Sequence, residues 1–113
     1  MLVKHELDVI LNSFIEGIKE LLGDRLRGVI LYGSYARGDF DAESDIDVML
    51  LLDTPENTLH NYRTLISRAA DKADWNYDAM LSPIMVDYTE FEKYKNDTPF
   101  YSTVNREGVR LIA

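Results

Sequence analysis

Two aspartates separated by one residue stand at the start of an apolar run, in the segment DIDVMLLL from Asp45 to Leu52. The run predicts a strand. Because side chains alternate faces along a strand, Asp45 and Asp47 point the same way, about 7 Å apart at the backbone. Ile46 and Val48 take the opposite face, where they can pack. Two like charges beside a core are destabilising unless compensated. A divalent cation such as Mg²⁺, which takes a few carboxylates together with phosphate oxygens and water, compensates them.

A Gly-Ser pair ends a second apolar run, GVILY from Gly28 to Tyr32. Gly33 allows a sharp turn and close approach of a ligand, and Ser34 offers a hydroxyl and an N–H. If residues 35–37 begin a helical turn, its free N–H groups face an anion. The segment is therefore a candidate phosphate cradle. Together with the aspartates it would hold a nucleoside triphosphate whose metal ions neutralise developing charge.

Each feature is a weak signal alone, because Gly-Ser turns are common and an Asp-x-Asp pair can be solvated. The intervening acids Asp39, Asp41 and Glu43 are predicted to be solvated loop residues. An apolar strand before and after the two features makes the combination much more informative than either one.

The elements that position these residues begin with an amphipathic helix that ends at Gly23. Strands follow over residues 28–32 and 45–52. A second helix is predicted from Thr54 as N-cap and Pro55 as first helical residue. The apolar stripe of the first helix comprises Leu7, Ile10, Leu11, Phe14, Ile18, Leu21 and Leu22. That of the second comprises Leu59, Tyr62, Ile66, Ala69, Ala70 and Ala73.

A third strand is predicted within residues 75–86, where Pro83 requires an edge position or a bulge. Thr89 is the expected cap of a short helix through residue 94. Thr98-Pro99 opens a last helix that stops near Gly108. The order predicts an α/β or α+β fold, one small sheet covered by helices, with residues 1–113 as a single domain.

Composition excludes several classes of protein. The net charge of −8 disfavours a grip on long DNA or RNA, since such binding depends on neutralising phosphates with Lys and Arg. The chain has no cysteine, so disulfides and thiol catalysis are excluded. No stretch predicts a signal peptide or a membrane helix, and the expected location is the cytoplasm.

The segment GSYARGDFDAESDIDV, from Gly33 to Val48, matches the pattern Gly-Ser, ten residues, Asp-x-Asp. It resembles the signature of DNA polymerase β-like nucleotidyltransferases. GSYARG with SDIDVMLL, and the final TPFYSTVNREGVRLIA, are similar to their minimal branch, the MNT proteins often encoded beside a HEPN-domain partner. The resemblance spans nearly the whole chain and implies the polymerase β-like nucleotidyltransferase fold, with a small mixed sheet covered by helices.

The resemblance also implies roles for individual residues. Gly33 and Ser34 would hold the triphosphate of ATP or another nucleoside triphosphate, and Asp45 and Asp47 would bind two Mg²⁺ ions. A third carboxylate on the next strand would complete the metal site and help to deprotonate the acceptor. The best match is Asp78, in NYDAMLSPIMV, and Asp87 is the alternative.

One further match to the family is Arg37. It is expected either to contact phosphate or to pair with the acidic loop, and the sequence leaves the two open.

The implied activity is an Mg²⁺-dependent transfer of a nucleoside monophosphate, AMP from ATP, to a hydroxyl. The acceptor would be a HEPN-domain toxin, and this chain its antitoxin. Two alternatives stand beside it: a non-catalytic antitoxin that masks a toxin by contact, and a nucleotidyltransferase for a small molecule such as an aminoglycoside.

A few remaining residues have simple expected positions. His5 and His60 are predicted at the surface and Trp75 in the core. Tyr35 is expected either to line the nucleotide site or to lie at the surface.

Overall fold

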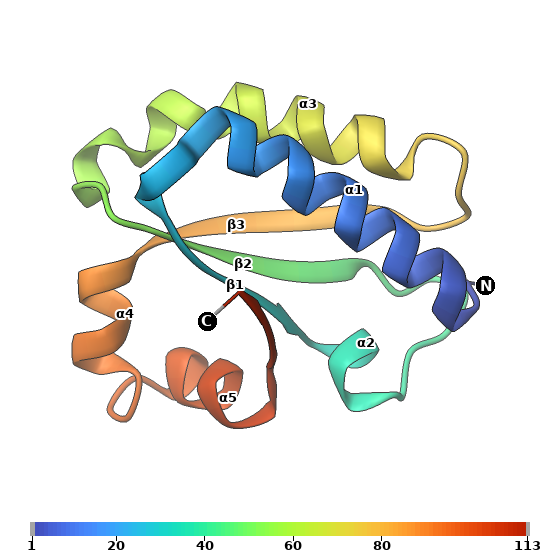
Figure 1. The fold of residues 1–113 in the computed structure, drawn as a ribbon. Helices are drawn as coiled ribbons and strands as arrows, with labels where there is room; N and C mark the ends of the chain where they lie inside the picture. Colours follow the sequence, from blue (N-terminus) through green and yellow to red (C-terminus); the bar gives the residue numbers. More distant parts are fainter. Residues whose placement is uncertain (1, 113) are drawn as a thin grey trace.

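The computed structural model describes residues 2–112, apart from the side chain of Glu56. Within that part of the chain four strands form one mixed sheet in the order β3-β2-β1-β4 (Figure 1). Strand β1 is antiparallel to both of its neighbours, whereas β2 and β3 are parallel. The strands are β1 (Leu26–Tyr32), β2 (Ile46–Leu52), β3 (Leu81–Asp87) and β4 (Val109–Ile112). The expected small mixed sheet covered by helices is confirmed.

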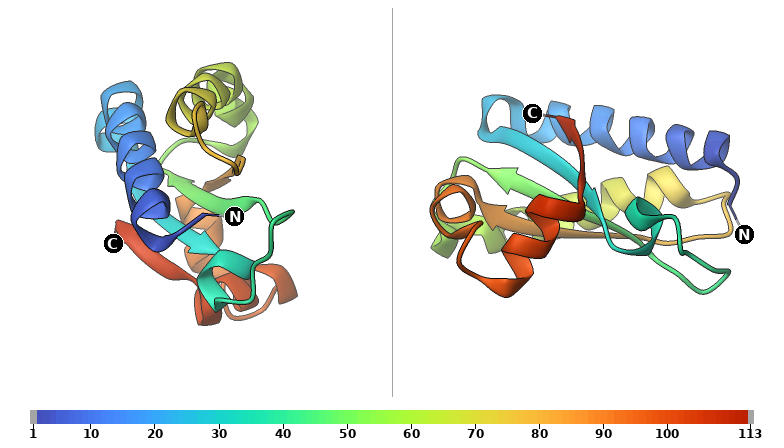
Figure 2. Two further views of the ribbon diagram at one scale, coloured as in Figure 1. Left: turned by 90° about the vertical axis from the view of Figure 1, so that its right-hand side faces the viewer. Right: turned by 90° about the horizontal axis from the view of Figure 1, so that it is seen from below.

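Helices cover both faces of the sheet. α1 (Lys4–Leu22) and α3 (Arg63–Asp74) lie side by side on one face, and α4 (Tyr88–Tyr94) and α5 (Pro99–Glu107) on the other (Figures 1 and 2). The alternation along β2 matches these layers. Ile46, Val48, Leu50 and Leu52 join the core under α1 and α3, as predicted, and Met49 and Leu51 pack with α4 and α5. This double burial explains why β2 is continuously apolar after Asp47.

The first helix has the predicted face and ends at Gly23, whose φ is 54°. Only Leu21 departs from the predicted stripe, being 41% exposed.

The predicted start of the second helix is wrong. Pro55 has an extended ψ of 140° and precedes a 3-10 helix (Glu56–Tyr62) that leads into α3. Pro55 is therefore the residue before the helix rather than its first residue. Its carbonyl accepts from both the backbone N–H and the hydroxyl of Thr58.

Pro83 lies in β3, an edge strand of the described sheet, as its missing N–H requires. β3 begins only at Leu81, whose N–H donates to the Asp74 carboxylate at 2.8 Å. This bond spans the loop of residues 75–80, which contains Trp75. Trp75 is 80% exposed, so the prediction of a core position is wrong. His5 and His60 lie at the surface, as predicted.

The two helices after β3 begin near their predicted positions. The cap of α4 is Asp87, whose carboxylate accepts from the Thr89 N–H at 3.1 Å, so Thr89 is not the cap. α5 begins at Pro99 and ends before Gly108, as predicted. Strand β4 follows Gly108 and pairs with the outer edge of β1, and the sequence reasoning missed it.

Candidate active site

A single helical turn, α2 (Ser34–Arg37), follows β1 directly. Gly33 joins them with φ 74° and ψ −155°, a conformation that essentially only glycine adopts. The N–H groups of Ala36 and Arg37 donate to the Gly33 carbonyl, both at 3.1 Å, and Gly38 ends the turn with φ 86°. The helical turn expected after Gly33 is present. However, the N–H groups of Ala36 and Arg37 donate to the Gly33 carbonyl, so they are not free for an anion as expected.

The antiparallel pairing of β1 with β2 brings this turn against the second aspartate. Tyr32 is opposite Asp47 in the register, so the next residue, Gly33, packs on the Asp47 side chain. A Cβ at position 33 would overlap the Asp47 Oδ2 atom and lie 3.3 Å from its Cγ. The candidate phosphate cradle and a candidate metal ligand are therefore in direct contact.

These groups open into one pocket of about 380 Å³, a volume within the range of small-ligand sites. Gly33, Ser34, Arg37 and Asp47, four of the six predicted site residues, line one side of it. The other lining residues are Tyr32 and, from α5, Phe100, Thr103, Val104 and Glu107. Asp45 is exposed at the residue before β2 begins.

The electrostatics of this pocket centre on Asp47. Burial, and then the charge of Asp45, raise the pKa of the Asp47 carboxyl, while Arg37 lowers it. Burial and the Asp47 charge also raise the pKa of Tyr32 to about 12, so its phenol keeps its proton and can donate a hydrogen bond. When Asp47 is ionised, the positive charge of Arg37 therefore only partly offsets the cost of burying its negative charge beside Asp45. Carboxylates are among the ligands that a divalent cation takes, together with water and phosphate oxygens.

Arg37 makes two ion pairs. Its Nε lies 3.2 Å from Asp39 in the acidic loop, and an Nη atom lies 3.7 Å from Glu107 on α5. Pairing with the acidic loop, one of the two expectations, is therefore observed. The side chain also lines the pocket.

A model of the family described as "Nucleotidyltransferase domain" matches residues 11–107. The chain belongs to the nucleotidyltransferase family. Two Methanocaldococcus jannaschii proteins, each named "Putative protein adenylyltransferase", are similar to this nucleotidyltransferase. One is 40% identical over 106 residues, 94% of this chain and 99% of that protein. The other is 32% identical over 82 residues, 72% of this chain and 55% of that protein.

A solved structure agrees on the fold. It is from Sulfolobus solfataricus and is described as "a putative nucleotidyltransferase". It matches with a TM-score of 0.53 and 20% sequence identity, over 96% of this chain and 87% of that one. At this identity the match supports the fold alone.

The two candidates for the third carboxylate lie at opposite ends of β3. Asp78 is exposed in the loop before the strand, and its charge helps to raise the pKa of Tyr35, after burial and Asp41 and before Asp45. Asp87 is opposite Leu52 in the register, at the far end of β2 from Asp47, about 17 Å away by strand rise. Of the two, only Asp78 is at the end of the sheet that carries the pocket.

Ser82 occupies the position on β3 opposite Asp47. Within residues 2–112, no three His, Cys, Asp or Glu side chains are arranged to hold one metal ion.

Sequence reasoning missed the α5 side of the pocket. Phe100, Thr103 and Glu107 recur at helical spacing beside the buried Val104, which places them on one face of α5. The sequence feature that could have indicated them is this stripe of aromatic and polar residues, which lies directly beside the core residue Val104. Without the position of α5 relative to Gly33, the stripe could not be assigned to this nucleotidyltransferase's pocket.

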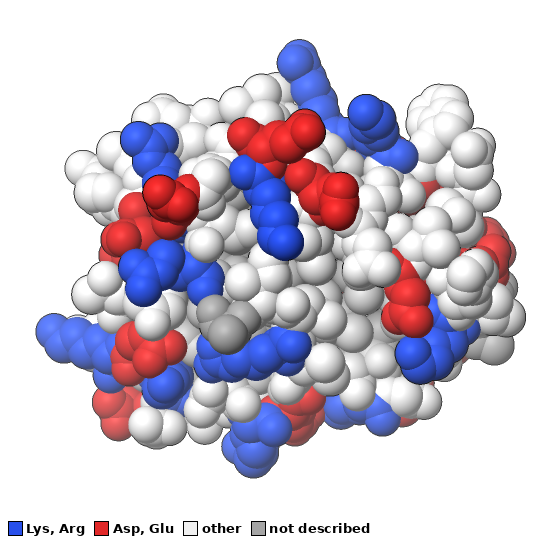
Figure 3. Space-filling model, viewed as in Figure 1, with Lys and Arg blue, Asp and Glu red and all other residues white. Residues whose placement is uncertain are grey.

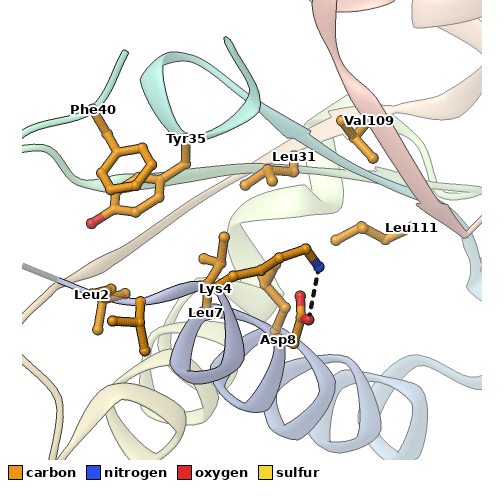
Figure 4. Close-up of a pocket in the computed structure, with 11 residues that line it drawn as sticks. Leu2, Lys4, Leu7, Asp8, Leu31, Tyr35, Phe40, Val109 and Leu111 are labelled. Atoms are coloured by element: carbon orange, nitrogen blue, oxygen red, sulfur yellow. Dashed lines mark hydrogen bonds and ion pairs between the residues drawn. The ribbon is translucent and has the colours of Figure 1, made fainter. Parts of the chain in front are cut away.

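Tyr35 is buried, with a relative exposure of 7%, and its ring stacks on Phe40 at 4.2 Å between centroids. It therefore does not lie at the surface, and it lines a different cavity, of about 390 Å³ (Figure 4). That cavity is mainly apolar and includes Leu7, Leu31 and Leu111, whereas its one lysine, Lys4, pairs with Asp8 at 3.1 Å. The apolar lining of this cavity does not suit a triphosphate, whereas the pocket at Gly33 has Ser34, Arg37 and Asp47 in its lining.

Lys and Arg are interspersed with Asp and Glu on the face shown in Figure 3. No helix within residues 2–112 is long and apolar enough to cross a membrane.

Proposed function

We propose that this nucleotidyltransferase moves AMP from ATP to a hydroxyl of a partner protein, with Mg²⁺ as its cofactor and residues 1–113 acting as one minimal domain. The contact between Gly33 and Asp47 is the observation that carries the proposal. It joins a phosphate-binding turn to a carboxylate that is under-compensated when ionised, and both face a pocket of ligand size.

Each predicted site residue has a role in the proposal. Ser34 and the backbone after Gly33 hold the triphosphate, and Arg37 adds a positive charge beside them. Asp45 and Asp47 would hold two Mg²⁺ ions, and Asp78 would be the third ligand. The three carboxylates are not arranged around one point within residues 2–112, so the loop before β3 would have to move for Asp78 to join them. When bound, Mg²⁺ neutralises charge on the phosphate oxygens and orients the displacement.

The reaction breaks one bond and forms one. The acceptor oxygen bonds to the α-phosphorus of ATP, and the bond from that phosphorus to the bridging oxygen of pyrophosphate breaks. Pyrophosphate leaves with the electron pair. The hydroxyl proton passes to a carboxylate, for which Asp78 is the candidate because it lies at the pocket end of the sheet and is exposed.

The proposed acceptor is a HEPN-domain toxin encoded beside this protein, with modification of that toxin as the antitoxin function. Two observations support a protein acceptor. One relative, matched over nearly its whole length, has a name that specifies protein adenylyltransferase. The sequence also resembles the minimal branch that is paired with HEPN proteins.

Incubation with ATP labelled at the α-phosphate, Mg²⁺ and the neighbouring gene product tests the proposal. We expect label on the partner with wild-type protein. With the double variant Asp45→Asn, Asp47→Asn we expect no label, although the complex still forms. Glu43→Gln, which alters an exposed acid of the same loop, is the matched control and should transfer label normally. A wild-type protein that binds the partner without labelling it contradicts the proposal. Unchanged toxin neutralisation by the double variant identifies masking by contact instead.

A further inference from the structure

We propose that Phe100 is the stacking platform for the nucleobase of the bound nucleotide, and that α5 forms the nucleoside half of the site. The inference rests on the proposed function, because it assigns a part of the same pocket. Phe100 lines the pocket together with Gly33, Ser34 and Asp47, which would hold the phosphates and metal.

Phe100 is a large aromatic side chain with 47% of its surface exposed. A scattered exposed apolar residue needs no explanation, but Phe100 lines a ligand-sized pocket. An aromatic ring there gains from being covered by another flat ring. Every nucleobase offers such a face, and base–aromatic stacking is tolerant of base identity.

The ring is held in place by its neighbours. Tyr32 contacts it edge to face, with centroids 5.7 Å apart and planes at 77°, and Tyr101 lies at 6.0 Å in a tilted arrangement. Tyr32 is in turn opposite Asp47 in the sheet, and the Asp47 charge helps to raise the pKa of Tyr32. A platform fixed by two aromatic neighbours loses little conformational entropy when a base stacks on it.

Positions along α5 match the two ends of a nucleotide. Glu107 forms an ion pair with Arg37, which places the C-terminal end of α5 beside the phosphate cradle. Phe100 is seven residues earlier, about 10 Å along the helix axis by helical rise. The base is the part of the nucleotide remote from the terminal phosphate, so the aromatic end of α5 is where it is needed. Thr103, between the two, offers the pocket a hydroxyl.

Trp75 and Tyr94 are also exposed aromatics, but they lie outside the pocket, on the 75–80 loop and on α4. Replacing either of them therefore shows whether losing any exposed aromatic side chain changes nucleotide binding.

The test compares two probes with the intact protein and Mg²⁺: ATP, and inorganic tripolyphosphate, which has the phosphates but no base. By calorimetry, we expect Phe100→Ala to weaken ATP binding about 5- to 150-fold, the range that corresponds to the loss of one base–aromatic stack. We expect its affinity for tripolyphosphate to stay within about twofold of wild type. Phe100→Tyr should retain ATP binding, and Trp75→Ala should behave as wild type. Ser34→Ala should weaken both probes.

A second measurement does not depend on loss of binding. Trp75 is the only tryptophan in the chain. The double variant Trp75→Phe, Phe100→Trp therefore has a single reporter at the platform. Its fluorescence should be quenched by ATP and unaffected by tripolyphosphate. If wild type binds ATP and Phe100→Ala binds it equally well, or if the reporter does not respond to ATP, the stacking inference is overturned and the proposed function stands. If wild type binds neither probe, both are overturned.

Discussion

Gly33 and Asp47 occupy adjoining space, so that any side chain at position 33 would displace the Asp47 carboxylate. The contact follows from the β1–β2 register, which places Asp47 opposite the residue before Gly33. Position 33 therefore requires glycine for two independent reasons. Its backbone conformation is one that essentially only glycine adopts, and a Cβ there would collide with Asp47, 14 residues later in the chain.

These two requirements can be separated by mutation. Gly33→Ala should destabilise the fold by about 1–3 kcal/mol, through its glycine-only conformation, and should abolish activity by moving Asp47. Gly38→Ala is the matched control. Gly38 also has a positive φ, of 86°, but a Cβ there would meet no atom within 4 Å. It should lose about 1–2 kcal/mol and keep its activity. Thermal unfolding and nucleotide transfer measure both effects, and an active Gly33→Ala protein would show that the contact is unimportant.

Replacing Asp47 should separate stability from activity. Asp47→Asn should lower activity by about 100-fold or more, because the proposed Mg²⁺ ligand is lost. It should also raise the melting temperature at pH 7 in the absence of metal, because an under-compensated charge is removed.

The pH dependence of that stabilisation has a definite sign. The folded-state pKa of Asp47 lies above the ordinary value of 3.8, so wild type loses stability as the pH rises from 3.8 through the folded pKa. The advantage of Asp47→Asn should thus be complete above the folded pKa and vanish below 3.8. A stability difference that is independent of pH, measured by thermal unfolding from pH 3 to 7, would contradict this account.

Arg37 should control the acid limb of the activity profile. Its charge lowers the pKa of Asp47, and Arg37→Met should therefore move the loss of activity on acidification to higher pH. The apparent KM for ATP should rise roughly tenfold or more from the lost charge-assisted contact. Both Arg37 ion pairs are partly exposed, so stability should change by less than about 1 kcal/mol. Arg68→Met, an exposed arginine on the opposite helix layer, should leave the pH profile unchanged.

Asp78 and Asp87 should give opposite results. Asp78→Asn should reduce transfer roughly 100-fold or more, as the loss of the proposed general base would. Asp87→Ala should remove the cap of α4 and destabilise by about 1 kcal/mol, with transfer kept. Rates and unfolding free energies measured for the two variants decide between them. Full activity in Asp78→Asn would mean that the carboxylate is not needed.

Most of the layered fold could be predicted because it follows from apolar periodicity. Local sequence patterns predict the apolar stripe of α1, the strands β1 and β2, and the start of α5 at Pro99. The errors occurred where individual hydrogen bonds or strand pairing decided the structure, such as the bonds of Thr58 to Pro55 and of Thr89 to Asp87. Trp75 lies in the loop that the bond from the Leu81 N–H to Asp74 spans, and apolar periodicity does not predict that bond. Strand β4 is only four residues long and is ordered by its pairing with β1.

The candidate site was predictable only in its first half. Gly33, Ser34 and Asp47 lie within one short segment, and the pairing of the two predicted strands brings them to one pocket. The opposite wall comes from Phe100 and Glu107. Those residues face the pocket only because α5 packs on β1, through contacts such as that of Gly108, whose missing Cβ leaves room for Ile30.

The separation of the two walls along the chain has a consequence for folding kinetics. The segment from β1 to β2 can form early because its contacts are close in sequence, whereas α5 must close a loop of more than 60 residues to reach Gly33. An early intermediate would thus expose the aspartates and the glycine turn without their aromatic wall. In a refolding experiment ATP binding should appear after most of the secondary structure, making the nucleotide a reporter of the last step of assembly.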